Sequence, residues 1–144
     1  MTKEIRILLV EDNEGDIVLT TQALKKANVT NIINVVKDGD VALKYLRKKG
    51  KFENAETPDL ILLDINLPKI DGMEVLAEIK RDEKLLSIPV VMLTTSDSEN
   101  DIVKSYNNHA NCYITKPVDF KKFMEVVQMI KDFWISIVKL PKKH

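Results

Sequence analysis

Four short apolar runs constrain the fold of this 144-residue chain more than any other feature, and they cover residues 5–10, 60–63, 88–93 and 112–115. The second run, LILL, is continuously apolar and lies between Pro58 and Pro68, which is typical of a strand buried on both faces. Helical patterns lie at residues 15–28, 39–49, 71–82, 98–108 and 118–138, and a charged segment at 48–57 is predicted to be a surface loop. Alternating strands and helices predict an α/β fold with right-handed crossovers and a parallel sheet that is covered on both faces.

Each apolar run is followed by side chains with carboxylate, hydroxyl or ammonium groups, which can bind ligands or take part in reactions. They are Glu11 and Asp12 after the first run, Asp64 after the second, Thr94, Thr95 and Ser96 after the third, and Lys116 after the fourth. We expect Asp64 to be the first residue of its run that can leave the core. In an open parallel sheet, ligands bind beyond the carboxyl ends of the strands, so these groups are expected to share one edge.

Converging carboxylates repel one another, and this predicts either a raised pKa or a bound cation. Magnesium takes one or two carboxylates together with phosphate oxygens, and Asp12, Asp64 and a backbone carbonyl could supply its protein ligands. A carboxylate, a divalent cation, a hydroxyl and an ammonium group together predict a site for a phosphoryl group, whose charge needs neutralising.

In their order along the chain these motifs resemble the receiver domains of two-component response regulators. The resemblance covers essentially the whole chain and rests on Glu11-Asp12, Asp64 within LLDINLPKIDG, Thr94 within PVVMLTT, and Lys116-Pro117. It implies a flavodoxin-like (βα)5 fold, in which a doubly wound, parallel, five-stranded sheet of order 2-1-3-4-5 has helices on both faces. The first and third strands are then neighbours, which would bring Asp12 and Asp64 together.

The resemblance also implies a phosphorylation site. Asp64 would accept a phosphoryl group from a phosphohistidine of a sensor histidine kinase. The metal would be Mg²⁺, for which Mn²⁺ could substitute, held by Asp12, Asp64 and the main-chain carbonyl of Asn66, with Glu11 binding through a water. No enzymatic activity is expected beyond self-phosphorylation from small phosphodonors and self-dephosphorylation.

The same resemblance implies a conformational switch. Lys116 would pair with Asp64 before the transfer and with a phosphoryl oxygen after it. Thr94 would donate a hydrogen bond to another phosphoryl oxygen, and its displacement would let Tyr113 turn inward, changing the surface of the fourth helix, fifth strand and fifth helix. Thr95, Asn66 and Ser96 flank the site, and the resemblance leaves the lifetime of the acyl phosphate open.

Composition bounds the partners and the compartment. Lys plus Arg and Asp plus Glu both number 22, so no overall charge favours nucleic acid or an acidic membrane surface. A single cysteine excludes a disulfide framework and suits a reducing cytosol. The chain contains no uncharged run of about 18 residues, the length that a membrane-spanning helix needs. The first predicted strand follows the N-terminus so closely that we expect no signal peptide. We expect a cytoplasmic protein in which residues 1–144 form one receiver domain without an output domain.

The C-terminal helical pattern offers a possible interface. One apolar stripe faces the predicted core, and a neighbouring stripe consists of Val126, Met129 and Phe133. An exposed stripe of this kind predicts a homodimer or a kinase contact, and the alternative is a broad core-facing side. The segment HANCYITKP, the extended loop and the C-terminal VKLP resemble the small response regulators of bacterial and cyanobacterial phytochromes, which implies a light-sensing kinase partner.

Two other functions compete with this one. A phosphatase of the haloacid dehalogenase type also uses a strand-end aspartate, Mg²⁺, a hydroxyl and a lysine, but it usually needs a second aspartate at the position of Asn66. The second alternative is a purely structural or protein-binding module, in which the acids have no chemical role. Taken singly, Asp64 is as well explained by a helix or turn cap, and Glu11-Asp12 by a solvated loop. The joint occurrence of the four motifs favours the phosphoryl site.

Overall fold

The computed structural model describes residues 6–27, 32–94, 112–116, 121–122 and 125. Within them the strands are β1 (Arg6–Val10), β2 (Ile32–Val36), β3 (Leu60–Asp64), β4 (Val90–Thr94) and β5 (Cys112–Thr115). The helices are α1 (Glu14–Ala27), α2 (Gly39–Leu46) and α3 (Gly72–Arg81), with a short 3-10 helix, η1, at Gly50–Phe52. The predicted helix at 98–108 and nearly all of the one at 118–138 lie outside the described residues.

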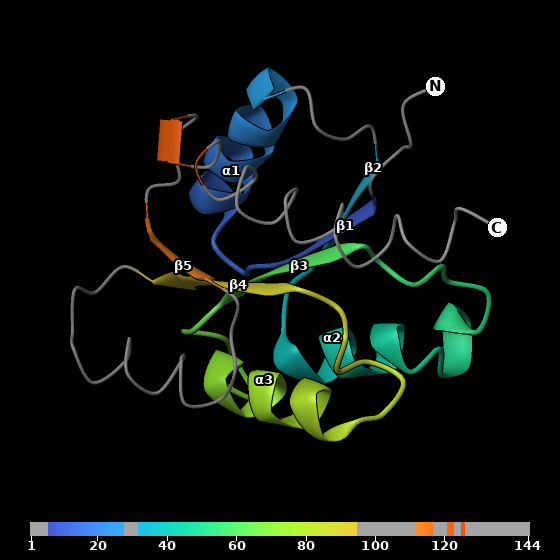
Figure 1. Ribbon diagram of the computed structural model, residues 1–144. Helices are drawn as coiled ribbons and strands as arrows, with labels where there is room; N and C mark the ends of the chain where they lie inside the picture. Colours follow the sequence, from blue (N-terminus) through green and yellow to red (C-terminus); the bar gives the residue numbers. More distant parts are fainter. Residues whose placement is uncertain (1–5, 28–31, 95–111, 117–120, 123–124, 126–144) are drawn as a thin grey trace, which may run out of the picture.

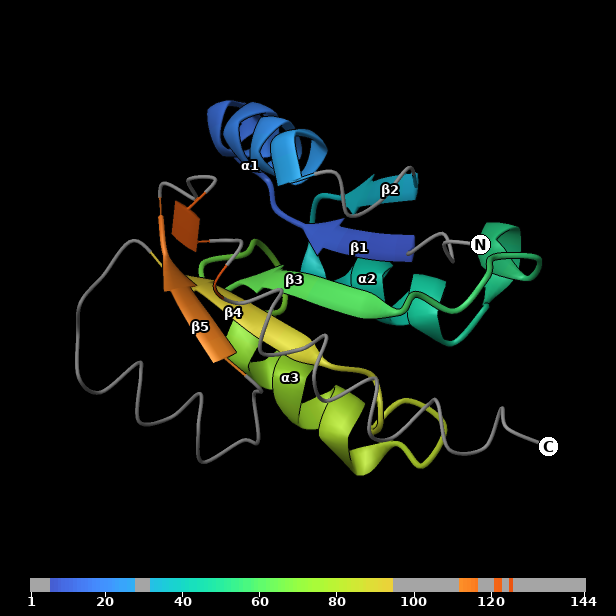
Figure 2. The same ribbon diagram turned by 45° about the horizontal axis from the view of Figure 1, so that its top comes forward.

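All strand pairs are parallel, and the sheet order is β2-β1-β3-β4-β5, as predicted. Helix α1 covers one face of the sheet, while α2 and α3 cover the other (Figure 1). Figure 2 shows the same layers from a second direction. The chain therefore has the doubly wound α/β architecture that its alternating pattern predicts.

The central strands supply the core on both faces. Under α2 and α3, Leu8, Ile61 and Met92 are fully buried, and under α1 Leu9, Leu62 and Leu93 are fully buried. Successive residues of a strand point to opposite faces, so a continuously apolar run is needed where helices cover both sides. Burying each such side chain contributes roughly 1.5–3 kcal/mol relative to exposure, which is why the runs form strands here.

Strand β2 was not assigned from the sequence pattern. It pairs only with β1, from Arg6↔Ile32 to Val10↔Val36, and lies at the edge of the sheet. Asn34 and Val35 are exposed. These two neighbours point to opposite faces, so this part of the edge strand is open on both sides and needs no continuous apolar run; the polar Asn34 interrupts IINVV, which therefore carries a weaker signal than the central strands.

Two strand boundaries differ from the prediction, and the helix predicted at 39–49 ends three residues early, at Leu46. Strand β3 continues through Asp64, which is only 1% exposed, so the prediction that this residue leaves the core was wrong. Strand β4 begins at Val90 rather than at Ile88, since Pro89 has no N–H for the ladder and contributes only its carbonyl, which accepts from Ile61.

Helix ends are set by local chemistry. The Asp71 side chain accepts hydrogen bonds from the amides of Met73 and Glu74 at the start of α3. Asp38 similarly accepts from Val41 at the start of α2. Helix α2 stops at Leu46, before Lys48 with its φ of 57°, and the predicted loop that follows contains η1.

Candidate functional site

Three carboxylates meet where β1 and β3 end. The register pairs Val10 with Leu63, so the residues that come next, Glu11 and Asp64, are level with each other. One carboxylate oxygen from each of Glu11, Asp12 and Asp64 lies within 4.8 Å of the other two. The prediction that these acids converge is confirmed.

The cluster is buried on one side and open on the other. Glu11 and Asp64 are 0% and 1% exposed, whereas Asp12 is exposed. Beside it lies a hollow of about 600 Å³, lined by Asp12, Ile65, Asn66, Leu67, Pro68, Asp71 and Met73. Hard divalent cations prefer oxygen ligands, so this donor set, with one solvent-facing carboxylate, fits such an ion.

Lys116 reaches the same cluster from the far edge of the sheet. Its amide donates to the carbonyl of Thr94 at 2.6 Å, which continues the β4–β5 ladder by one residue. Its Nζ atom lies 2.9 Å from Oε1 of Glu11 and 3.3 Å from Oδ2 of Asp64, and the side chain is 6% exposed. Cation and acids are thus enclosed together, as the strand-end motifs predicted.

A fourth acid, Asp16, was missed by the sequence analysis. Its Oδ2 atom lies 2.8 Å from Nζ of Lys116, closer than either other acid. Asp16 belongs to the first turn of α1, and its amide donates to Oδ1 of Asn13. Acids are common in first helical turns because they interact favourably with the positive end of the helix dipole. Nothing in the sequence therefore distinguishes Asp16 from an ordinary acid at the start of a helix.

Burial and charge shift two pKa values in the cluster. Burial is the main cause that raises the pKa of Glu11 to about 7; the hydrogen bond from Lys116 opposes this, and the neighbouring Asp64 adds to it. Burial alone would lower the pKa of Lys116, but its hydrogen bonds to Asp16 and Glu11 outweigh that effect and raise it. The lysine therefore remains a cation, and among the acids it is the pKa of Glu11 that shows the cost of burial.

The remaining predicted residues take different positions. Thr94, the last residue of β4, is 1% exposed and pairs in register with Thr115. Tyr113 is half-buried and packs against the core under α2 and α3. The amide of Asn66 donates to Oδ1 of Asp64 at 3.2 Å, so this loop already holds the carboxylate.

The predicted interface residues Val126, Met129 and Phe133 lie outside the described residues, as do Thr95 and Ser96.

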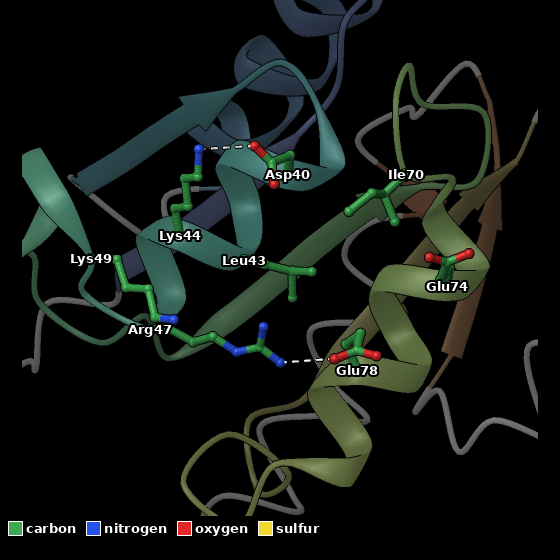
Figure 3. A pocket seen from close by; sticks show the side chains of 8 residues that line it. All are labelled: Asp40, Leu43, Lys44, Arg47, Lys49, Ile70, Glu74 and Glu78. Carbon is green, nitrogen blue, oxygen red and sulfur yellow. Dashed lines mark hydrogen bonds and ion pairs between the residues drawn. The ribbon is translucent and has the colours of Figure 1, made fainter.

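A second hollow, of about 330 Å³, lies between α2 and α3 (Figure 3). Arg47 crosses it to Glu78 at 2.9 Å, and Lys44 pairs with Asp40 on its own helix. Its opposite charges largely satisfy one another, which distinguishes this hollow from the buried acid cluster.

Comparison with known proteins identifies relatives along almost the whole chain. Residues 7–128 match the sequence profile of the response regulator receiver domain. The response regulator Rcp1 of Synechocystis sp. is 47% identical over 135 residues, which span 94% of this chain and 92% of that protein. These matches give the haloacid dehalogenase-type alternative no support.

Two crystal structures are similar to the fold described above. That of the phosphorylated cyanobacterial phytochrome response regulator RcpA has a TM-score of 0.79 and 51% identity, covering 93% of this chain and 96% of that one. That of the Mn²⁺-bound form of Rcp1 has a TM-score of 0.77 and 46% identity, covering 92% of this chain and 96% of that one. Both structures agree with the fold, and the Mn²⁺ of the second agrees with a divalent-cation site.

Proposed function

Because the chain belongs to the response regulator receiver domain family, whose members are phosphorylation-switched parts of two-component systems, we propose that Asp64 is its phosphoacceptor. The observation that supports this most is the position of Asp64: it is buried at the end of β3, within 4.8 Å of two further carboxylates and 3.3 Å from the Lys116 ammonium. In this reaction an Asp64 oxygen forms a bond to phosphorus while the bond from phosphorus to the kinase histidine breaks. The imidazole nitrogen keeps the electron pair.

The metal in this proposal is Mg²⁺, with Mn²⁺ able to substitute. Asp12 and Asp64 would bind it directly, the carbonyl of Asn66 would be a third ligand, and Glu11 would hold a water ligand. When bound, the ion screens the carboxylate from the incoming phosphoryl group and helps to align the two. The three-acid cluster supports this assignment, because Asp12 gives the ion a solvent-facing ligand.

The proposed switch uses the groups at the ends of β4 and β5. Thr94 would donate to one phosphoryl oxygen and Lys116 to another. Tyr113, half-buried beside the core, would turn inward as Thr94 moves. Phosphorylation can shift these conformations only through contacts that differ between them.

Incubation with Mg²⁺ and acetyl phosphate tests the phosphoacceptor directly. Intact mass spectrometry should show a gain of one phosphoryl group in the wild type and none in Asp64→Asn. The gain should disappear when EDTA replaces the metal. A phosphoryl group that survives Asp64→Asn would remove Asp64 from this role.

The proposed partner is a sensor histidine kinase, and the relatives support one of the phytochrome type. Such a kinase, phosphorylated on its histidine with labelled ATP, should transfer the label to the wild type within minutes and leave Asp64→Asn unlabelled. The ATP-dependent donor is consistent with a cytoplasmic protein. No described helix is long and apolar enough to cross a membrane.

A homodimer through Val126, Met129 and Phe133 is a separate part of the proposal. Sedimentation at micromolar concentration, with and without acetyl phosphate, should show a dimer that Phe133→Asp weakens. A strict monomer under both conditions would rule the dimer out.

A further inference from the structure

We propose that Asp16 is a positioning residue that competes with phosphorylated Asp64 for Lys116, and so opposes the phosphorylated state. This inference rests on the proposed role of Asp64 as phosphoacceptor. It adds a residue of α1 to a reaction whose other participants all lie at strand ends or in the loop after β3.

The contacts of Lys116 are the first step. Its Nζ atom donates hydrogen bonds to Asp16 at 2.8 Å and to Glu11 at 2.9 Å, whereas Asp64 is an ion-pair neighbour at 3.3 Å. A lysine ammonium has three donors on a flexible stem, and its direction is set by the acceptors that hold it. In the unphosphorylated protein, the shortest of these contacts points to α1 and not to the phosphoacceptor.

Asp16 also differs from the other acids in what it can bind. The carboxylates close enough to share a metal ion among the described residues are those of Glu11, Asp12 and Asp64, and Asp16 is not among them. Its side chain is 24% exposed, compared with 0% for Glu11. A cation held by that cluster would therefore not directly engage Asp16, and the contact between Asp16 and Lys116 would remain.

The helix fixes Asp16 in place. The Asn13 side chain accepts from the Asp16 amide at 2.9 Å, and the Asn13 carbonyl accepts from Ile17 at 2.9 Å. This pattern begins α1 and holds the residue beside the sheet edge. Because the helix holds the main chain of Asp16, a movement of Nζ of Lys116 towards a phosphoryl group on residue 64 lengthens its contact with Asp16.

Phosphorylation shifts that balance. The acyl phosphate carries up to about two negative charges on its phosphoryl oxygens in place of the single charge of the carboxylate, and these strong acceptor oxygens attract the ammonium towards residue 64. The cost of drawing Lys116 away from Asp16 is then subtracted from the stability of the phosphorylated form. Removing the Asp16 carboxylate should therefore favour the phosphorylated form.

Beryllofluoride with Mg²⁺ is a suitable probe, because it forms a stable mimic of the phosphoryl group on an aspartate. Asp16→Asn should bind it on the order of threefold to tenfold more tightly than the wild type, as expected for one partly exposed charge contact. The same variant should bind Mg²⁺ alone with nearly wild-type affinity. Asp16→Glu, which restores the carboxylate, should return beryllofluoride affinity towards the wild-type value.

Glu14→Gln is the matched control. Glu14 is an acid in the same helical turn, but it pairs with Lys37 on the surface instead of Lys116. Removing its charge should leave beryllofluoride affinity almost unchanged, which separates a direct effect on Lys116 from a general change in electrostatic potential.

The outcomes distinguish this inference from the function on which it rests. If the wild type takes up neither beryllofluoride nor a phosphoryl group, both proposals fail. If the wild type takes up both and Asp16→Asn binds the probe equally well or more weakly, the competition is refuted while the phosphoacceptor role stands. A gain in Asp16→Asn that Glu14→Gln reproduces equally would also refute it.

Discussion

Gly72 lies directly against the backbone of Asp64. Its amide donates to the carbonyl of Ile65 at 2.8 Å, and a Cβ atom at residue 72 would overlap the carbonyl oxygen of Asp64 and come within 2.7 Å of the Ile65 Cα atom. The first residue of α3 therefore supports the strand end that carries the proposed phosphoacceptor.

Gly72→Ala should lower the free energy of unfolding by about 1–3 kcal/mol, because the added methyl group must displace the main chain. It should also slow phosphorylation by acetyl phosphate severalfold, since that main chain carries Asp64. Urea unfolding and the rate of mass gain measure the two effects.

Gly39→Ala is the control for this change. Its Cβ atom would overlap the carbonyl oxygen of Ile70 and lie 2.7 Å from Cγ2 of Val75, away from Asp64. A comparable loss of stability is expected, with a smaller effect on phosphorylation of the folded protein. Equal rates for the two variants would contradict the proposed coupling of Gly72 to the site.

Asp12→Asn should separate metal binding from folding. Asp12 is the exposed member of the three-acid cluster, so its loss should raise the dissociation constant for Mn²⁺ at least about tenfold. In EDTA, the free energy of unfolding of this variant should stay within about 0.5 kcal/mol of the wild-type value, because an exposed carboxylate contributes little to packing. Calorimetric titration and thermal unfolding test these expectations.

Asp71→Asn provides the comparison, since Asp71 lines the same hollow but lies outside the acid cluster. Its Mn²⁺ affinity should stay close to that of the wild type. Tight Mn²⁺ binding by Asp12→Asn would show that Asp12 is not a direct ligand.

Asp71→Ala should cost about 1 kcal/mol of stability. The Asp71 carboxylate accepts from the Met73 amide at 2.6 Å and from the Glu74 amide at 3.3 Å, and alanine leaves both amides without this acceptor. Asp71→Asn keeps an acceptor oxygen and should lose much less. Equal losses in the two variants would indicate that charge, rather than capping, matters here.

Lys69→Gly should stabilise the protein by about 0.5–1 kcal/mol. Lys69 has a φ of 67°, a left-handed conformation that costs roughly 1–2 kcal/mol for a residue with a Cβ atom. Glycine removes this cost, but part of the gain in stability is lost because glycine is more flexible in the unfolded state. Lys69→Ala is the control, because it removes the weak 3.8 Å ion pair with Asp38 but keeps the strain. A higher melting temperature is expected for glycine only.

The site residues that could be predicted from the sequence are those at the ends of the apolar runs. Asp64, Thr94 and Lys116 each follow or close an apolar run, and burial of that run places its last residue at the sheet edge. Glu11 and Asp12 follow the same rule, so the convergence of the acids could be predicted. The depth of Asp64 could not be predicted, because β3 extends through residue 64 and the Ile65 amide just beyond it still donates to the Leu93 carbonyl.

The sequence by itself determined the α/β class, the central strands and the residues at their ends, since continuous apolar runs and helical periodicity are local consequences of burial. The resemblance to receiver domains added the strand order, which the structure confirms. Only the tertiary structure located edge strand β2, because the exposed Asn34 interrupts its apolar run. It alone joined Asp16 to Lys116, 100 residues apart, because such a contact depends on how α1 packs beside β5 and leaves no periodic trace in the chain.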